Sequence, residues 1–168
     1  SDTHNEIENV RKAVSVFESL GIDTVIHCGD VTIPRVLEVF KSFRVFLAYG
    51  NMDIDKEMLS ITLKKQDKQN KAGPFLDFEL AGKRIFVIHG DDGYSLRMAI
   101  KSGEYDYVFT GHTHRVRDEK VGNTRVINPG ALGGAFYEPR SIAYLDLETD
   151  QLGRYYLQYL HICFKIFT

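Results

Sequence analysis

The sequence predicts an α/β fold in which two packed β-sheets are flanked by helices. Three observations lead to this prediction. Apolar runs typical of buried strands alternate with stretches of helical periodicity in the first half of the chain. In the second half, strand-like runs are paired around short turns such as Gly122-Asn123. The length of 168 residues and the 43% hydrophobic content suit one globular domain with a substantial core.

The first half contains two predicted helices and two predicted strands. Ile7 to Leu20 has apolar residues at helical spacing, and Pro34 fits the first turn of a second, shorter helix. Thr24 to Cys28 and Val45 to Tyr49 are apolar runs that predict buried strands. The charged stretch from Lys64 to Lys71 is expected to be a solvated loop or a helix end.

The second half is dominated by predicted hairpins. A short helix is expected around Leu96 to Ile100, and Tyr107 to Phe109 predicts a buried strand. The arms of the three hairpins are expected at 75–80 with 84–88, at 115–120 with 125–128, and at 141–147 with 154–160.

Charge, hydropathy and cysteine content limit the function classes. The net charge of -2 provides no broad basic field for nucleic acid. No apolar run approaches the ~20 residues that cross a membrane, and the first residues do not resemble a signal peptide. Cys28 and Cys163 form neither a disulfide framework nor a cysteine-rich zinc site. We therefore expect two buried thiols in a cytoplasmic protein.

Polar side chains gather where predicted strands end. Gly29-Asp30, Gly50-Asn51, His89-Gly90 and the run Gly111 to His114 each follow a strand, and the start of the chain, Ser1 to His4, adds a fifth polar turn. Sites in α/β sheets form at the carboxyl ends of strands, so these five turns are expected to converge on one crevice. Together they supply two carboxylates, one carboxamide and four imidazoles: Asp2, Asp30, Asn51, His4, His89, His112 and His114.

The spacing within two of these turns favours metal binding. His112 and His114 are two residues apart, and so are Asp2 and His4. In an extended backbone, residues i and i+2 point to the same side, so each pair is expected to face one spot. A single histidine after a strand is more often a hydrogen-bonded loop residue. Two of them behind Gly111, which lets the backbone come close to a ligand, indicate a metal site.

The number and type of donors indicate two metal ions. Seven nitrogen and oxygen donors without a thiolate are too many for one four-coordinate zinc. They suit two divalent ions of hard or borderline character, such as Mn, Fe, Ni, Co or Zn. Two such ions clamp the attacking and leaving oxygens of a phosphate ester, so the chemistry that best explains this donor set is phosphoryl transfer.

The motifs in their order resemble those of the calcineurin-like metallophosphoesterases, in particular the small prokaryotic phosphodiesterase branch. They are Asp-x-His, Gly-Asp, Gly-Asn-x-Asp, His-Gly and Gly-His-Thr-His, followed by the run from Val126 to Gly130. The resemblance covers the chain from Ser1 to about Leu160. It implies a metallophosphoesterase-like α/β/β/α sandwich formed by one domain, residues 1–160, with residues 161–168 as an extra apolar tail.

The resemblance also implies roles for the seven residues. One metal would be held by Asp2, His4, Asp30 and His114, and the other by Asp30, Asn51, His89 and His112. Asp30 would bridge the metals, Asn51 would contact the phosphate, and Asn51, His112 and Asp30 are the expected catalytic residues. A hydroxide bridging the two metals would attack phosphorus in line.

The expected function is hydrolysis of a small phosphate ester, most simply a phosphodiester, with Mn or Ni as the first expectation for the metals and Fe, Co or Zn as alternatives. A non-catalytic, metal-binding scaffold protein of the same fold is the alternative, because the similar eukaryotic retromer subunit serves chiefly as a scaffold. That subunit lacks the full set of metal histidines, which this chain keeps. A one-metal hydrolase would leave Asn51 and His89 without a role.

Several nearby residues have separate expectations. Met52 stands where larger relatives have a histidine, and because methionine cannot transfer a proton, we expect a preference for esters with good leaving groups. Asp53 is expected to orient its loop rather than bind metal. His27 is expected to be a core histidine. Asp91 and Asp92 are expected to cap the following helix.

Two further features remain open at this point. Relatives begin with an apolar strand before the Asp-x-His motif, which this sequence does not show, so one hypothesis places residues 164–167 in that position; a sequence truncated or given out of chain order is the other explanation. Aromatic residues are frequent late in the chain and are expected in the core, on sheet faces or at a homodimer surface: Phe136, Tyr137, Tyr144, Tyr155, Tyr156 and Tyr159.

Overall fold

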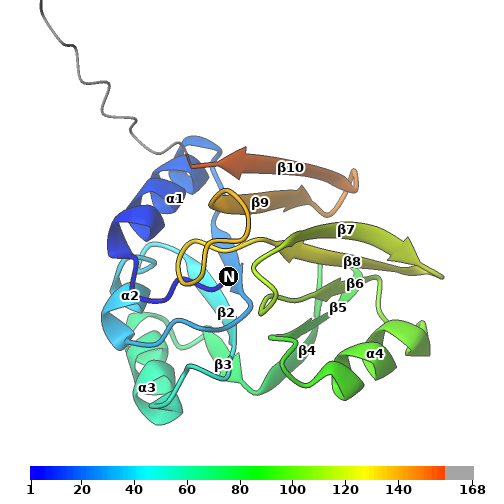
Figure 1. Ribbon diagram of the computed structural model, residues 1–168, viewed down its shortest axis with the longest axis horizontal. Coiled ribbons are helices and arrows are strands. Elements are labelled where there is room, and N and C mark those ends of the chain that lie inside the picture. The colour runs from blue at the N-terminus through cyan, green and yellow to red at the C-terminus, as the bar shows by residue number, and fades with distance from the viewer. Residues whose placement is uncertain (158–168) are drawn as a thin grey trace, which may run out of the picture.

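The computed structural model describes residues 1–157, which form four layers (Figure 1). Three helices form the first layer: α1 (Ile7–Ser19), α2 (Pro34–Glu38) and α3 (Lys56–Gln66). Two β layers follow, and α4 (Gly93–Ser102) covers the far side of the second of them. This order confirms the predicted α/β class with sheets flanked by helices.

The β layers contain three hydrogen-bonded sheets. A parallel sheet has the order β1-β2-β3, with β1 (Thr24–His27), β2 (Arg44–Ala48) and β3 (Lys71–Gly73). A mixed sheet has the order β4-β5-β6-β8-β7, and β9 pairs with β10 in a two-stranded sheet. The bounds of these strands are β4 (Phe75–Leu80), β5 (Lys83–Ile88), β6 (Tyr107–Phe109), β7 (Val116–Val121), β8 (Thr124–Pro129), β9 (Ser141–Asp146) and β10 (Gln151–Tyr156).

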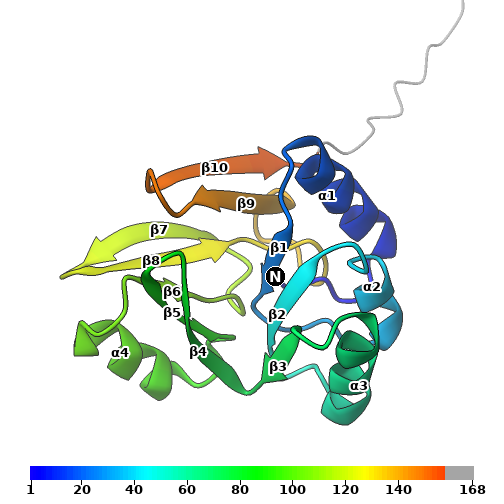
Figure 2. The ribbon, with the colours of Figure 1, turned by 180° about the vertical axis from the view of Figure 1, so that it is seen from behind.

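Three apolar clusters hold the layers together. Val10, Ala13 and Phe17 recur on one face of α1 and pack with α2, α3 and β2 in the first cluster. In β5, Ile85 and its neighbour Phe86 point to opposite faces of the sheet. Ile85 lies between the β layers and Phe86 lies under α4, which is why this strand is apolar without alternation. The α1 helix lies beside β10 in both views (Figure 1 and Figure 2).

The last hairpin begins its second arm earlier than predicted. That arm was expected from Arg154, but β10 starts at Gln151. The Asp146 side chain accepts hydrogen bonds from the backbone N–H groups of Glu148 and Thr149, and Asp150 adopts a left-handed backbone. These contacts close the turn tightly, so strand pairing resumes at once. The predicted residues 158–160 of this arm lie outside the described part of the chain.

The charged stretch predicted as a loop or helix end proves to be partly structured. Its first residues form the last turn of α3, as the helix-end alternative expected, whereas Lys71 opens the short strand β3, which was not predicted. Asn70 between them is buried: its side chain accepts a hydrogen bond from Val45 N and donates one to Leu63 O. Tertiary hydrogen bonds therefore fix a segment whose composition alone indicates solvent.

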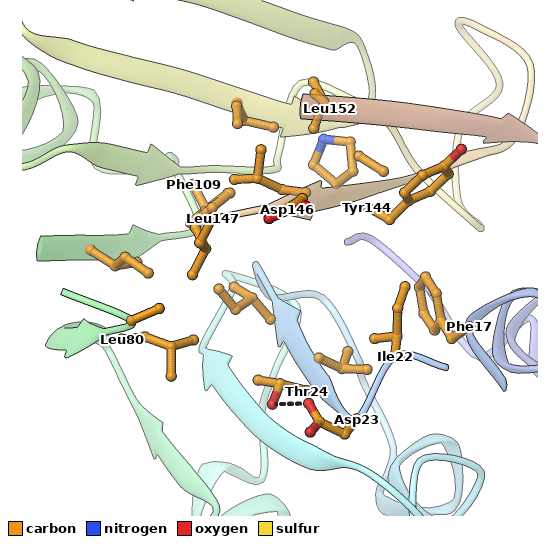
Figure 3. Close-up of a pocket in the computed structure, with 18 of the residues that line it drawn as sticks. Phe17, Ile22, Asp23, Thr24, Leu80, Phe109, Tyr144, Asp146, Leu147 and Leu152 are labelled. Atoms are coloured by element: carbon orange, nitrogen blue, oxygen red, sulfur yellow. Dashed lines mark hydrogen bonds between the residues drawn. The ribbon is translucent and has the colours of Figure 1, made fainter. Parts of the chain in front are cut away.

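A cavity of about 860 Å³ separates β1 from the β9–β10 hairpin (Figure 3). Leu80, Phe109 and Leu147 lie on one side of it, and Phe17 and Tyr144 lie on the other. Consecutive residues line it on both strands, 24–26 of β1 and 143–146 of β9. Because neighbouring strand residues point to opposite faces, such a run means that the strand's edge faces the cavity. Within residues 1–157, one edge of β1 and one edge of β9 have no partner strand, and these two edges face each other across an apolar gap.

The hypothesis that residues 164–167 supply a further strand concerns residues outside 1–157, so it stays a prediction. The cavity gives it a test, because a strand there would be shielded from solvent. In a Cys163→Ser background, a cysteine introduced by Ile166→Cys is expected to react with a thiol reagent roughly 100-fold more slowly than in the unfolded chain. Burial raises the pKa of the Cys28 thiol to about 12, so Cys28 adds little signal at neutral pH.

The control is Thr149→Cys in the same background, since Thr149 lies in the exposed turn between β9 and β10. Its thiol is expected to react at nearly the unfolded rate. Equal reactivity of the cysteines at positions 149 and 166 would contradict the hypothesis.

Among the helices of residues 1–157, none has the length and apolar character needed to cross a bilayer.

Candidate metal centre

All seven residues predicted as metal ligands meet at one place, where the strands end. Asp30 follows β1, Asn51 follows β2 and His89 follows β5, while His112 and His114 come after β6. The start of the chain lies alongside β1's end: Asp2 N donates to Gly29 O at 3.0 Å and His4 N donates to Asp30 O at 3.0 Å. The predicted convergence of the five turns is therefore what the structure contains. The large cavity lies elsewhere, since none of the seven residues lines it.

The side chains form two adjoining groups. In the first, His114 Nε2 lies 3.3 Å from Asp2 Oδ1 and 3.2 Å from His4 Nε2. In the second, His89 Nε2 lies 3.1 Å from Asn51 Oδ1 and 3.5 Å from Asp30 Oδ2. The His112 ring packs against the His89 ring with 5.0 Å between their centroids. Asp30 Oδ2 is also 3.5 Å from His4 Nε2, so this carboxylate lies between the two groups.

Backbone carbonyls set the orientation of two imidazoles. His89 Nδ1 lies 2.6 Å from Cys28 O, and His114 Nδ1 lies 2.8 Å from Ala135 O. A carbonyl oxygen only accepts, so each Nδ1 carries a proton, and whenever the ring is neutral its Nε2 turns a lone pair toward the cluster. This is the arrangement in which metal-binding histidines are usually held.

The donor set fits divalent cations. Carboxylate oxygens and neutral Nε2 atoms face one another at 3.2 to 3.5 Å, where lone pairs repel unless a cation or protons lie between them. Such atoms form two triads, and within each triad all three donor atoms lie within 4.8 Å of one another. One triad is Asp2, His4 and His114, and the other is Asp2, Asp30 and His89. Nitrogen and oxygen donors without thiolate are the ligands of borderline and hard divalent metals.

The carboxylates of the cluster are poised to be ionised. Burial opposes ionisation of Asp2 and Asp30, but hydrogen bonds outweigh it and hold the pKa of each below its ordinary value. For Asp2 the main partner is His114, and for Asp30 it is His89. Without a bound metal, the charged form of His114, protonated on both ring nitrogens, donates from Nε2 to Asp2, and this bond raises the pKa of the imidazole. Ionised carboxylates are the form that binds metal.

The backbone of the centre corrects one sequence argument. The two i, i+2 pairs were expected to be extended, but Asp2, His4, His112 and His114 all have positive φ, between 41° and 65°, and so does Asp30 at 57°. Such left-handed residues other than glycine are uncommon and gather at functional sites. As a result, His114 joins Asp2 and His4, whereas His112 lies beside His89, so the histidine pair divides between the two groups.

Asp53 orients the surrounding loops, as predicted. Its buried carboxylate accepts hydrogen bonds from the backbone N–H groups of Asp30 at 3.0 Å, Thr32 at 2.7 Å and Gly50 at 2.8 Å. It thereby ties the turn after β1 to the turn after β2. A Cβ at Gly50 would come within 2.6 Å of Asp30 N, so glycine is required where these two turns touch.

Of the other expectations near the centre, those for His27 and Asp92 are largely met and the one for Asp91 is not. His27 is buried in β1 as expected of a core histidine; its Nδ1 accepts from Gly29 N, whereas its Nε2 has no hydrogen-bond partner within the described residues. Asp92 caps α4 by accepting from Tyr94 N and Ser95 N, whereas no such bond is found for Asp91 within the described residues. Met52 is 47% exposed, and its backbone N–H donates to Asp30 Oδ1.

The loop from Gly133 to Arg140 was not predicted to belong to the site. Ala135 O orients His114, and Gly134 lies so close that a Cβ there would come within 2.7 Å of His114 Cε1. Phe136 and Tyr137 on this loop are exposed, so neither has the core or sheet-face position expected of most of these aromatic residues, and the homodimer-surface alternative stays a prediction. The available signal was the Gly133-Gly134 pair followed by two aromatic residues directly after the Asn-Pro-Gly run.

Known proteins are similar to this chain in sequence and in fold. Residues 1–150 match the calcineurin-like phosphoesterase superfamily domain. Phosphodiesterase MJ0936 of Methanocaldococcus jannaschii is 37% identical over 153 residues, which are 90% of this chain and 92% of that protein. The solved structure of a novel archaeal phosphodiesterase superposes with a TM-score of 0.88 at 36% identity, covering 93% of this chain and 96% of that one.

More distant structures share the fold alone. Vacuolar protein sorting 29 of Cryptosporidium parvum is 21% identical with a TM-score of 0.57, covering 86% of this chain and 89% of that one. The family match, in contrast, spans nearly all of the described residues and includes every one of the seven clustered side chains. The chain therefore belongs to the calcineurin-like phosphoesterase superfamily, whose members use divalent metals, and it is a phosphoric ester hydrolase.

Proposed function

We propose that this protein hydrolyses small phosphodiesters with two divalent metal ions held by the seven clustered residues. The observation that carries this proposal is the position of Asp30. Its Oδ2 lies 3.5 Å from His4 Nε2 in one group and 3.5 Å from His89 Nε2 in the other. A carboxylate shared between two groups of donors is what a bridging ligand requires.

The distances support one assignment of ligands. Asp2, His4 and His114 would hold the first ion together with Asp30, and Asn51, His89 and His112 would hold the second together with Asp30. Asp2 and His89 are buried and would contact the ions on the protein's side, while Asn51 and His112 are exposed to solvent. An anionic substrate therefore approaches from the side of Asn51 and His112.

Bound at these residues, divalent metals would activate water for in-line attack and neutralise charge that develops on the phosphate. The protein's residues orient the reactants. The Asn51 carboxamide, held beside His89, has an N–H that donates to a phosphate oxygen, and the exposed His112 faces the same approach. Asp53 fixes the backbone of Asp30 and Gly50, so the carboxylate between the groups is placed before substrate arrives.

Several finer expectations stay predictions. Mn or Ni are proposed for the metals, with Fe, Co or Zn as alternatives, because geometry and availability decide among them. A homodimer, a cytoplasmic location, and a domain of residues 1–160 with a tail at 161–168 stay predictions as well. The exposed Met52 cannot protonate a leaving group, which supports the expected preference for esters with good leaving groups.

Hydrolysis of bis-p-nitrophenyl phosphate by metal-stripped protein tests the proposal. Without metal, activity is expected to be absent, and adding Mn²⁺ or Ni²⁺ is expected to restore it. Substituting His112→Ala is expected to lower the restored rate by about 10²-fold or more, because one ligand of the second ion is lost. Rates should be compared at saturating metal so that weaker binding and slower chemistry are separated.

The matched control is His161→Ala, since His161 has no role in the proposal. Its rate is expected to equal that of the unmodified chain. A folded protein that binds two ions but hydrolyses no diester with any of the five metals would contradict the proposal and favour the scaffold alternative. Activity that is unaffected by metal removal would contradict it as well.

A further inference from the structure

Two aromatic side chains stand at the rim of the metal centre. Tyr137 is 62% exposed and Phe136 is 57% exposed, although both belong to the loop that contacts the metal-binding imidazoles. The Tyr137 ring lies beside the His114 ring, with 5.9 Å between centroids and 57° between planes. Single exposed aromatics are ordinary on protein surfaces. A neighbouring pair next to a hydrolytic centre calls for a reason.

The loop that carries these rings is fixed at several points. Arg140 is buried, and its guanidinium donates to the carbonyl oxygens of Gly133 and Gly134. The Glu138 carboxylate accepts from Val116 N at 2.7 Å, which ties the loop to β7. With Ala135 O bound to His114 as well, attachments lie on both sides of residues 136 and 137. The two rings are thus presented in place, which lowers the entropy cost of stacking a ligand on them.

A positively charged side chain lies beside the Tyr137 ring. The Arg115 guanidinium lies 5.9 Å from the centre of the Tyr137 ring. Within residues 1–157, no carboxylate forms an ion pair with Arg115 at 4.0 Å or less. An arginine beside an aromatic ring suits a ligand that combines an anion with an aromatic group.

We propose that Tyr137 is a specificity residue that stacks on the nucleobase of a small nucleoside phosphodiester. This rests on the proposed function, because the phosphate would lie at the ions next to His114. A sugar between phosphorus and base bridges a gap of the order that separates His114 from Tyr137. Long nucleic acid is not the expected substrate, because the net charge of -2 offers no basic track for a backbone.

Two ligands that differ only in the base provide the test: thymidine 5′-monophosphate and 2-deoxyribose 5-phosphate. Both are used as competitive inhibitors of bis-p-nitrophenyl phosphate hydrolysis by the Mn²⁺-loaded full chain. The base is expected to tighten binding about tenfold, the lower part of the range for stacking on an aromatic side chain. In Tyr137→Ala this preference should fall below about twofold, and Tyr137→Phe should retain it because the ring remains.

Tyr155→Ala is the matched control, since Tyr155 is 45% exposed and lies on β10, opposite Ile142 of β9, rather than on the loop from Gly133 to Arg140. It is expected to keep the full preference. An unchanged preference in Tyr137→Ala, or no preference in the unmodified chain, would overturn this inference while leaving the hydrolase proposal intact. If no hydrolysis occurs at all, calorimetric titration of the Mn²⁺-loaded protein with the same two ligands measures the preference independently.

Discussion

Replacing Asp30 by asparagine is expected to lower phosphodiester hydrolysis by about 10³-fold or more and to reduce the number of tightly bound metal ions from two to one. Asp30 Oδ2 is 3.5 Å from a histidine nitrogen of each group, so the two ions share this carboxylate in the proposed arrangement. The neutral amide removes the negative charge that holds two cations close together. Metal content by mass spectrometry and initial rates on bis-p-nitrophenyl phosphate measure both effects.

Asparagine is the sharpest choice at this position because it preserves the fold. Asp30 has a φ of 57°, and asparagine tolerates this left-handed conformation better than other residues of similar size. Asp77→Asn on β4 is the control, since Asp77 lies in a partly exposed ion pair with Arg84 and away from the centre. Two tightly bound ions and a nearly unchanged rate in Asp30→Asn would exclude the shared-carboxylate arrangement.

Substituting Asp53→Ala is expected to destabilise the protein by about 3–5 kcal/mol, because three backbone N–H groups lose a charged acceptor. The carboxylate is 1% exposed, so water does not readily replace it beside Asp30, Thr32 and Gly50. For a chain of this length, the loss corresponds to a fall in Tm of roughly 6–20 °C. Thermal and urea unfolding of the metal-free protein measure it without interference from bound ions.

A neighbouring aspartate supplies the comparison. Asp55 is exposed and caps α3 through Met58 N, so Asp55→Ala is expected to cost only about 1 kcal/mol. Asp53→Asn should fall between the two, because its amide keeps one accepting oxygen but turns an N–H toward backbone N–H groups. If the free energy of unfolding of Asp53→Ala differs by less than about 1 kcal/mol from that of the unmodified chain, the three hydrogen bonds do not hold the turns together as described.

The sequence by itself determined the fold class and the identity of the clustered residues. Both depend on short-range patterns: the helical spacing of Val10, Ala13 and Phe17, and the polar turns that follow apolar strands. Strand ends in α/β folds meet at one edge, so Asp30, Asn51 and the histidines could be expected together before any distance was known. The orienting role of Asp53 also followed from its place two residues after Asn51.

Only the tertiary structure decided how these residues divide and what surrounds them. The left-handed backbone at His112 and His114, which separates two histidines expected to act together, depends on contacts made some 110 residues away, such as the bonds from His112 N to Asp2. The same holds for the loop that sets Tyr137 beside His114, and for the gap between the edges of β1 and β9. Local sequence encodes periodicity and turns, whereas contacts between residues far apart in the chain are fixed only when the packed layers bring distant segments together.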